Sequence, residues 1–130
     1  MIGKTMQDAM NEQINKELFS SYLYLSMAAW FEESNLPGFA NWMRIQADEE
    51  REHAMKFYEF ILERGGKVQL KAIDAPKAEW SSTLEAVKEV AAHEGKVSAS
   101  IHALYELALK EKDYPAQVML QWFITEQVEE

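Results

Sequence analysis

Apolar residues recur at alternating steps of three and four along four segments of this chain, the pattern of amphipathic helices packed in a bundle. The first segment, 5–34, contains neither Pro nor Gly and ends at the turn-forming sequence Asn-Leu-Pro-Gly, 35–38. The second extends from about 38 to 64 and ends at Gly65-Gly66, a common signal for the end of a helix. A turn this short predicts that the first two helices are antiparallel.

The second half of the chain predicts another antiparallel pair. Ser82, with Glu85 three residues later, forms a capping box at the start of a helix that reaches about 112. Asp113 followed by Tyr114-Pro115 predicts the start of a fourth helix. The segment 65–81 shows no helical periodicity, and it can span about 56 Å, more than the roughly 40 Å of the second helix. We therefore expect an all-α, four-helix bundle with one long crossover between helices two and three.

Ionisable residues interrupt the apolar stripe of each predicted helix. At 1.5 Å per residue, the ionisable residues of the first three helices lie about 18 to 25 Å from one end of the bundle. Those of the fourth helix lie at the same level. The interrupting residues are Glu17 with Tyr24 in the first helix, Glu50 with His53 in the second, Glu94 in the third, and Gln127 with Glu130 in the fourth.

Four carboxylates and one imidazole at one level of a core indicate a cation site. Buried carboxylates are costly and repel one another unless metal ions or shared protons compensate their charge. Neither Lys nor Arg occupies these stripes. Oxygen-rich ligation with a single His favours Fe or Mn over a structural zinc. The four Glu suffice for two divalent ions, with Glu50 placed to bridge them.

Composition narrows the classes of function. With 130 residues and 48% hydrophobic residues, the chain is expected to form one domain, 1–130, with a sizeable core. A net charge of −9 argues against nucleic acid or an anionic membrane as a partner. The chain has no Cys, no signal-peptide pattern and no membrane-spanning apolar run, so we expect a cytoplasmic protein.

Residues next to the predicted ligands allow two interpretations. Tyr24 is either a core aromatic residue or a redox or supporting residue beside the site. His93 and His102 miss the apolar stripe of the third helix and are predicted to lie at the surface. Three further carboxylates form either an ordinary acidic surface or an additional, more exposed metal site: Glu49, Glu126 and Glu129.

The stretches NKELFSSYLYLSMAAWFE, GFANWMRIQADEEREHAMKFYEFILERGG and LQWFITEQVEE resemble a prokaryotic non-haem ferritin, and the resemblance covers essentially the whole chain. It implies a ferritin-like di-iron family member whose fourth helix continues beyond Glu130 and is followed by a short fifth. The chain then ends part-way through the fourth helix. The implied first iron is held by Glu17, Glu50 and His53, and the second by Glu50, Glu94 and Glu130 with Gln127 nearby. Implied ligands of a weaker third site are Glu49, Glu126, Glu129 and Glu130.

The resemblance also implies an activity. Ferrous iron would be oxidised by dioxygen or peroxide, with Tyr24 beside the centre, and ferric mineral would be stored inside a homo-oligomeric shell of two dozen subunits. Haem is not expected, because Arg51 stands where bacterioferritins carry their haem-ligand Met, and Gln127-x-x-Glu130 replaces their second Glu-x-x-His. Two alternatives remain: a rubrerythrin-like peroxidase, and a catalytically disabled shell subunit.

Overall fold

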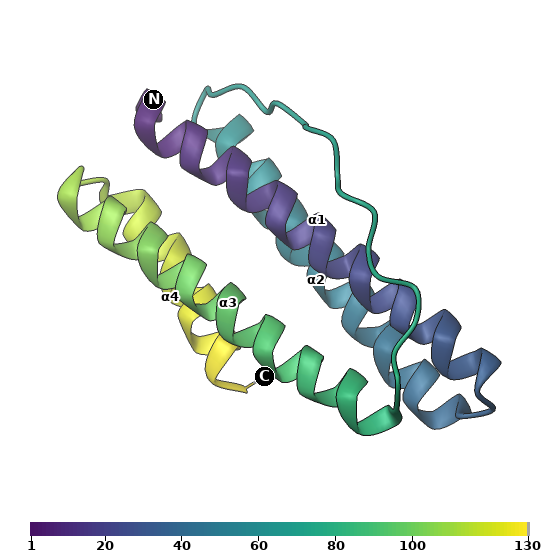
Figure 1. Cartoon of the computed structure of the whole chain (residues 1–130). Coiled ribbons are helices and arrows are strands. Elements are labelled where there is room, and N and C mark those ends of the chain that lie inside the picture. The colour runs from purple at the N-terminus through teal and green to yellow at the C-terminus, as the bar shows by residue number, and fades with distance from the viewer. Residues whose placement is uncertain (130) are drawn as a thin grey trace.

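The computed structural model describes residues 1–129 as four α-helices joined by two tight turns and one long connection (Figure 1). The helices are α1 (Lys4–Glu33), α2 (Pro37–Glu63), α3 (Thr83–Lys110) and α4 (Tyr114–Glu129). Within this bundle α1 lies antiparallel to α2, α3 lies antiparallel to α4, and the two pairs meet along α1 and α3. The all-α bundle expected from the sequence is confirmed, and α4, at 16 residues, is shorter than the 28-residue α3.

The long connection, 64–82, runs beside α1 from the end of α2 to the start of α3 (Figure 1). Side chains of α1 bind its backbone along the way: Asn11 Nδ2 donates to the carbonyl of Lys67 (3.0 Å), and Ser26 Oγ donates to the carbonyl of Lys77 (2.6 Å). These contacts confirm the crossover. They show how α3 comes to begin at the end of the bundle where α1 meets α2.

Two glycines end α2 because the chain must turn sharply against the N-terminal residues. Gly65 has a φ of 73°, and its N–H donates to the carbonyl of Leu62 at 3.1 Å. The N–H of Gly66 donates to the carbonyl of Ile61 at 2.9 Å, which completes a Schellman motif. A Cβ on Gly66 would lie 2.7 Å from a methyl group of Ile2, so only glycine fits there.

Side-chain caps begin α3 and α4, as the sequence predicts. Ser82 Oγ accepts a hydrogen bond from the N–H of Glu85 (3.1 Å), and Asp113 Oδ1 accepts one from the N–H of Ala116 (3.1 Å). Asp113 has a second role, because Arg64 Nη1 donates to both of its carboxylate oxygens at 2.7 and 2.8 Å. This pair ties the end of α2 to the start of α4.

The core consists of two apolar clusters with a polar level between them. In α1, the first cluster reaches as far as Ile14 and the second begins at Leu23. The same break occurs between Ala47 and Ala54 in α2 and between Val90 and Val97 in α3. Each break contains predicted metal ligands, so the structure places the ligands of the first three helices at one level of the bundle, while Tyr24 belongs to the second cluster.

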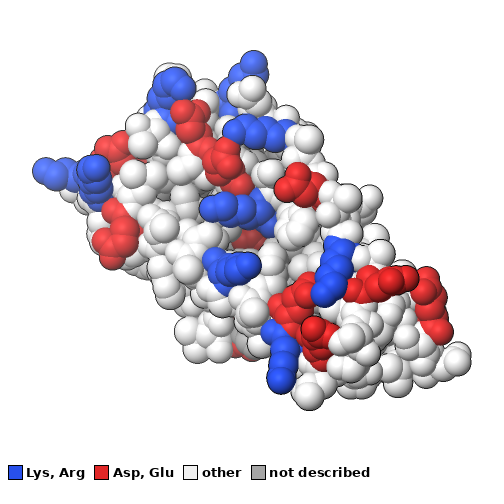
Figure 2. All heavy atoms as spheres, viewed as in Figure 1, with Lys and Arg blue, Asp and Glu red and all other residues white. Residues whose placement is uncertain are grey.

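Charges of both signs are interspersed on the face formed by α1, α3 and the connection (Figure 2). Lys71 pairs there with Glu12, and Lys77 lies 3.4 Å from Glu89. Such exposed pairs contribute little to stability. Within residues 1–129, no helix combines the length and apolar character needed to cross a membrane.

The dual role of Asp113 predicts that Asp113→Ala destabilises the bundle by about 2 to 3 kcal/mol, because it removes a helix cap and a charged hydrogen bond together. Urea unfolding at one assembly state measures this. Asp8→Ala is the matched control, since it breaks only the exposed pair of Lys4 and Asp8, with an expected cost below about 0.5 kcal/mol. Equal effects of the two substitutions would contradict the assigned role.

Candidate metal centre

Three predicted ligands converge inside the bundle. Glu17 comes from α1, and Glu50 and His53 come from one face of α2, three residues apart; their exposed fractions are 1%, 0% and 4%. One ligand atom from each lies within 4.8 Å of the others. His53 Nδ1 is 3.4 Å from Glu50 Oε2 and 3.9 Å from Glu17 Oε2. The three-residue helical spacing of Glu50 and His53 therefore directs both side chains into the core.

Gln13 orients Glu17 from one helical turn away. Its Nε2 donates to Glu17 Oε1 (3.1 Å) and to Ser100 Oγ on α3 (3.1 Å). Ser100 Oγ in turn donates to the carbonyl of Val97 at 2.7 Å. Gln13 is itself 1% exposed. This amide was missed in the sequence, although its position four residues before Glu17 places it on the same helical face.

Aromatic residues of α4 form an apolar wall beside His53. Its ring meets those of Trp122 and Phe123 edge-on, with centroids 5.5 and 5.6 Å away. The Nζ of Lys56 lies 4.3 Å from the centre of the Trp122 ring. Apolar walls of this kind keep the local dielectric low and strengthen every charge interaction within the site.

The electrostatics of the metal-free site centre on Glu17. Burial raises the pKa of its carboxyl well above the usual value, and the adjacent Glu50 raises it further, by hydrogen bonding to the protonated form and by charge repulsion. Gln13 and His53 lower the same pKa, but by less. The metal-free site therefore favours the protonated, neutral form of the Glu17 carboxyl.

The donor set fits a cation. Within residues 1–129, while the carboxylates are ionised, Glu17 Oε2 and His53 Nδ1 are buried atoms with no hydrogen-bond partner. Such atoms are costly in a folded protein unless something compensates them. A metal ion between the three side chains would satisfy both atoms and offset the negative charge.

Glu94 lies at the same level of the bundle on α3 but is not one of the three converging ligands. It is half-buried and accepts a hydrogen bond from the Tyr24 hydroxyl at 2.5 Å. Gln127 Nε2 donates to Ser98 Oγ at 2.8 Å and lies 3.5 Å from Glu94 Oε2. Glu94 is therefore positioned by neighbours already in the metal-free protein. Glu130, the last predicted ligand, lies outside the described residues.

Comparison with known proteins agrees with this geometry. The family model of the ferritin-like domain matches residues 7–130 of this chain. The bacterial non-haem ferritin of Staphylococcus haemolyticus is 42% identical over all 130 residues, which span 78% of that protein, and its Staphylococcus aureus counterpart is 40% identical over the same lengths.

Solved structures agree as well. The open pore ferritin of the archaeon Archaeoglobus fulgidus superimposes with a TM-score of 0.98 at 50% identity, covering 99% of this chain and 80% of that one. The ferritin of Chlorobium tepidum gives 0.96 at 38% identity, with 99% and 79% covered.

The chain belongs to the ferritin family. The resemblance read from the sequence is confirmed, and membership supports iron storage as its function. In this ferritin, Glu17, Glu50 and His53 form the candidate site for the metal.

The three additional carboxylates of this ferritin lie around one cavity. Glu49, Glu126 and Glu129 line a space of about 360 Å³ between α2 and α4, and Glu49 and Glu126 are half-buried. Glu49 is the chain neighbour of the buried Glu50. Carboxylates scattered over an acidic surface would not share one cavity. The structure thus brings the three predicted residues together.

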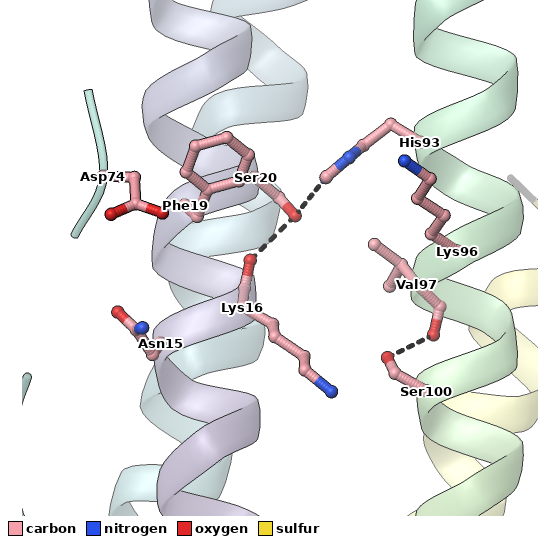
Figure 3. Close-up of a pocket in the computed structure, with 9 residues that line it drawn as sticks. All are labelled: Asn15, Lys16, Phe19, Ser20, Asp74, His93, Lys96, Val97 and Ser100. Atoms are coloured by element: carbon pink, nitrogen blue, oxygen red, sulfur yellow. Dashed lines mark hydrogen bonds between the residues drawn. The ribbon is translucent and has the colours of Figure 1, made fainter. Parts of the chain in front are cut away.

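One prediction about this ferritin was wrong. His93, expected at the surface, is half-buried, and its Nε2 lies 2.7 Å from Ser20 Oγ on α1 (Figure 3). Burial lowers the pKa of its imidazole. His102 is exposed, as predicted. The error arose because His93 lies beside the stripe that faces the centre of the bundle, while α1 passes close enough to cover it.

The raised pKa of Glu17 predicts a pH dependence of the metal-free ferritin. A carboxyl whose pKa is raised in the folded state makes its full contribution to stability at pH values below its pKa in the unfolded chain, which is near 4.5. That stability is lost as the pH rises through the folded pKa, by at most about 1.4 kcal/mol per pH unit. Glu17→Gln should therefore lose less stability than the unaltered chain as the pH rises from about 4.5 to 7.

Chelator-treated protein unfolded in urea at several pH values provides the measurement. Glu12→Gln is the control, because Lys71 lowers rather than raises the pKa of that exposed carboxyl. If stability follows the same pH curve with and without the Glu17 carboxyl, the electrostatic account of the site fails.

Proposed function

We propose that this ferritin oxidises ferrous iron at a two-iron centre and passes the ferric product to a mineral stored inside a protein shell. The observation that carries the proposal is the cluster of Glu17, Glu50 and His53, buried between two apolar halves of the core. A bundle maintained by apolar packing alone would gain nothing from burying two carboxylates there. A bound substrate cation would offset the negative charge of the buried cluster.

We assign the first iron to Glu17, Glu50 and His53, with Nδ1 as the imidazole ligand because that nitrogen faces both carboxylates. Glu50 would bridge to a second iron held by Glu94, with Gln127 beside it and Glu130 as a further ligand. Tyr24 supports this assignment, because its hydroxyl already fixes the orientation of the Glu94 carboxylate.

The chemistry follows from charge. Each ferrous ion gives up one electron, and two electrons with two protons convert dioxygen to hydrogen peroxide, or peroxide to two waters. Anionic ligands in a low-dielectric site stabilise the ferric ion more than the ferrous ion, so Glu17 and Glu50 favour the loss of each electron. The proton that the raised pKa of Glu17 favours in the metal-free protein leaves when iron binds.

Storage requires assembly, and we propose a homo-oligomeric shell of two dozen subunits because the superimposed chains are ferritins. A cytoplasmic location, a single domain over 1–130 and the absence of haem stay predictions from the sequence. A rubrerythrin-like peroxidase is less well supported, since the chain has no Cys and carries Gln127 where a second Glu-x-x-His would begin. A disabled subunit is disfavoured by the three converging ligands.

Ferroxidase activity predicts that anaerobic titration loads two ferrous ions per chain, and that an oxygen pulse then gives a fast rise in ferric absorbance. Glu50→Ala should abolish that rise, because it removes the bridging ligand. Glu52→Ala is the control, since Glu52 is exposed on the same helix. A wild-type protein with no fast phase would refute the proposed activity, and so would a Glu50→Ala protein that keeps it.

The cavity lined by Glu49, Glu126 and Glu129 is proposed to bind an additional iron more weakly. Changing all three to Ala should reduce the iron bound at saturation or the turnover rate, while the first two ferrous ions still bind. Isothermal titration and repeated oxygen pulses measure both quantities. A control protein loses the same charge at exposed positions, namely Glu33, Glu106 and Glu111. If the two proteins behave alike, the cavity is only acidic surface.

A further inference from the structure

A hydrogen bond between α1 and α3 connects a residue outside the proposed ligand set to the site. His93 reaches from α3 to Ser20 on α1, with Nε2 2.7 Å from Oγ (Figure 3). Ser20 is fully buried, and its hydroxyl donates to the carbonyl of Lys16 at 2.9 Å. A hydroxyl has a single proton to donate, so His93 Nε2–H must be the donor to Ser20. The imidazole is therefore anchored on the opposite helix.

The anchored ring packs on Tyr24. The two rings meet edge to face, with centroids 5.8 Å apart and planes at 87°. Phe19 supports the imidazole from another direction, with a centroid distance of 5.9 Å. Tyr24 is fully buried, and its hydroxyl donates to Glu94 Oε1 at 2.5 Å. A sequence of contacts thus leads from Ser20 through His93 and Tyr24 to the carboxylate of Glu94.

The anchor matters because His93 borders open space. It lines a cavity of about 360 Å³ between α1, α3 and the connection, together with Lys16, Lys96 and Asp74 (Figure 3). An imidazole without a partner could turn into this space and leave one side of the Tyr24 ring uncovered. The bond to Ser20 prevents that rotation.

We propose that His93 is a positioning residue, which is held by Ser20, restrains the Tyr24 ring and so fixes Glu94 to receive the second iron. The inference rests on the proposed function, because it concerns affinity for that iron. His93 is not a ligand of the first iron and makes no described contact with Glu17, Glu50 or His53. Binding of the first iron should therefore not depend on it. Residues that orient a metal ligand in this way commonly change affinity by about 10- to 100-fold when they are replaced.

The test compares His93→Phe, which keeps a ring but loses the donor, with Ser20→Ala, which keeps the imidazole but loses its acceptor. Anaerobic ferrous titration should show affinity for the second iron reduced about 10- to 100-fold in each, with the first iron unchanged. The double variant should be no weaker than either single one, because both break the same contact. His102→Phe, on the exposed face of α3, is the control and should bind as the unaltered chain does.

Crystal structures of the metal-free proteins give a second readout that does not depend on iron. His93→Phe should show Tyr24 rotated and its bond to Glu94 lengthened, whereas His102→Phe should not. Equal loss of both irons, additive losses in the double variant, or an unmoved Tyr24 would each overturn the inference. If the unaltered chain binds no second iron, the proposed function fails, while the crystal structures still decide whether His93 positions Tyr24.

Discussion

Two carboxylates buried side by side impose the constraint on which the rest of this ferritin depends. Glu17 and Glu50 face each other where water cannot solvate them, and their mutual repulsion opposes folding until a proton or a cation intervenes. The bundle tolerates them because apolar clusters pack on both sides of that level along α1, α2 and α3. The stability of the metal-free fold therefore comes from the two ends of the bundle, and its chemistry comes from the middle.

The contacts around the carboxylates all bring helices together at that middle level. Gln13 connects Glu17 to α3, His93 connects α3 back to α1, and Tyr24 connects α1 to Glu94. The polar level thus joins the two antiparallel pairs as well as forming the candidate site. Farther away, the pair of Arg64 and Asp113 joins α2 to α4 at one end of the bundle, so directional contacts link the helices there as well as at the level of the site.

Much of this could be predicted from the sequence, and the failures have a physical cause. Helical periodicity and caps at Ser82 and Asp113 predicted the elements, and the spacing of Glu50 and His53 directed both inward. Periodicity reports the face that a helix turns to the centre of a bundle. It does not report which flanking side chains a neighbouring helix covers, so the burial of His93 was missed. The half-buried position of Glu94 depends in the same way on its neighbours.

The most direct test of the central claim is anomalous diffraction at the iron edge from crystals soaked anaerobically in ferrous iron. The account predicts a peak within bonding distance of Glu17, Glu50 and His53 Nδ1, and a second peak about 3.5 to 4 Å away beside Glu94. Iron peaks confined to surface carboxylates, with the three buried side chains unchanged and no density between them, would contradict it.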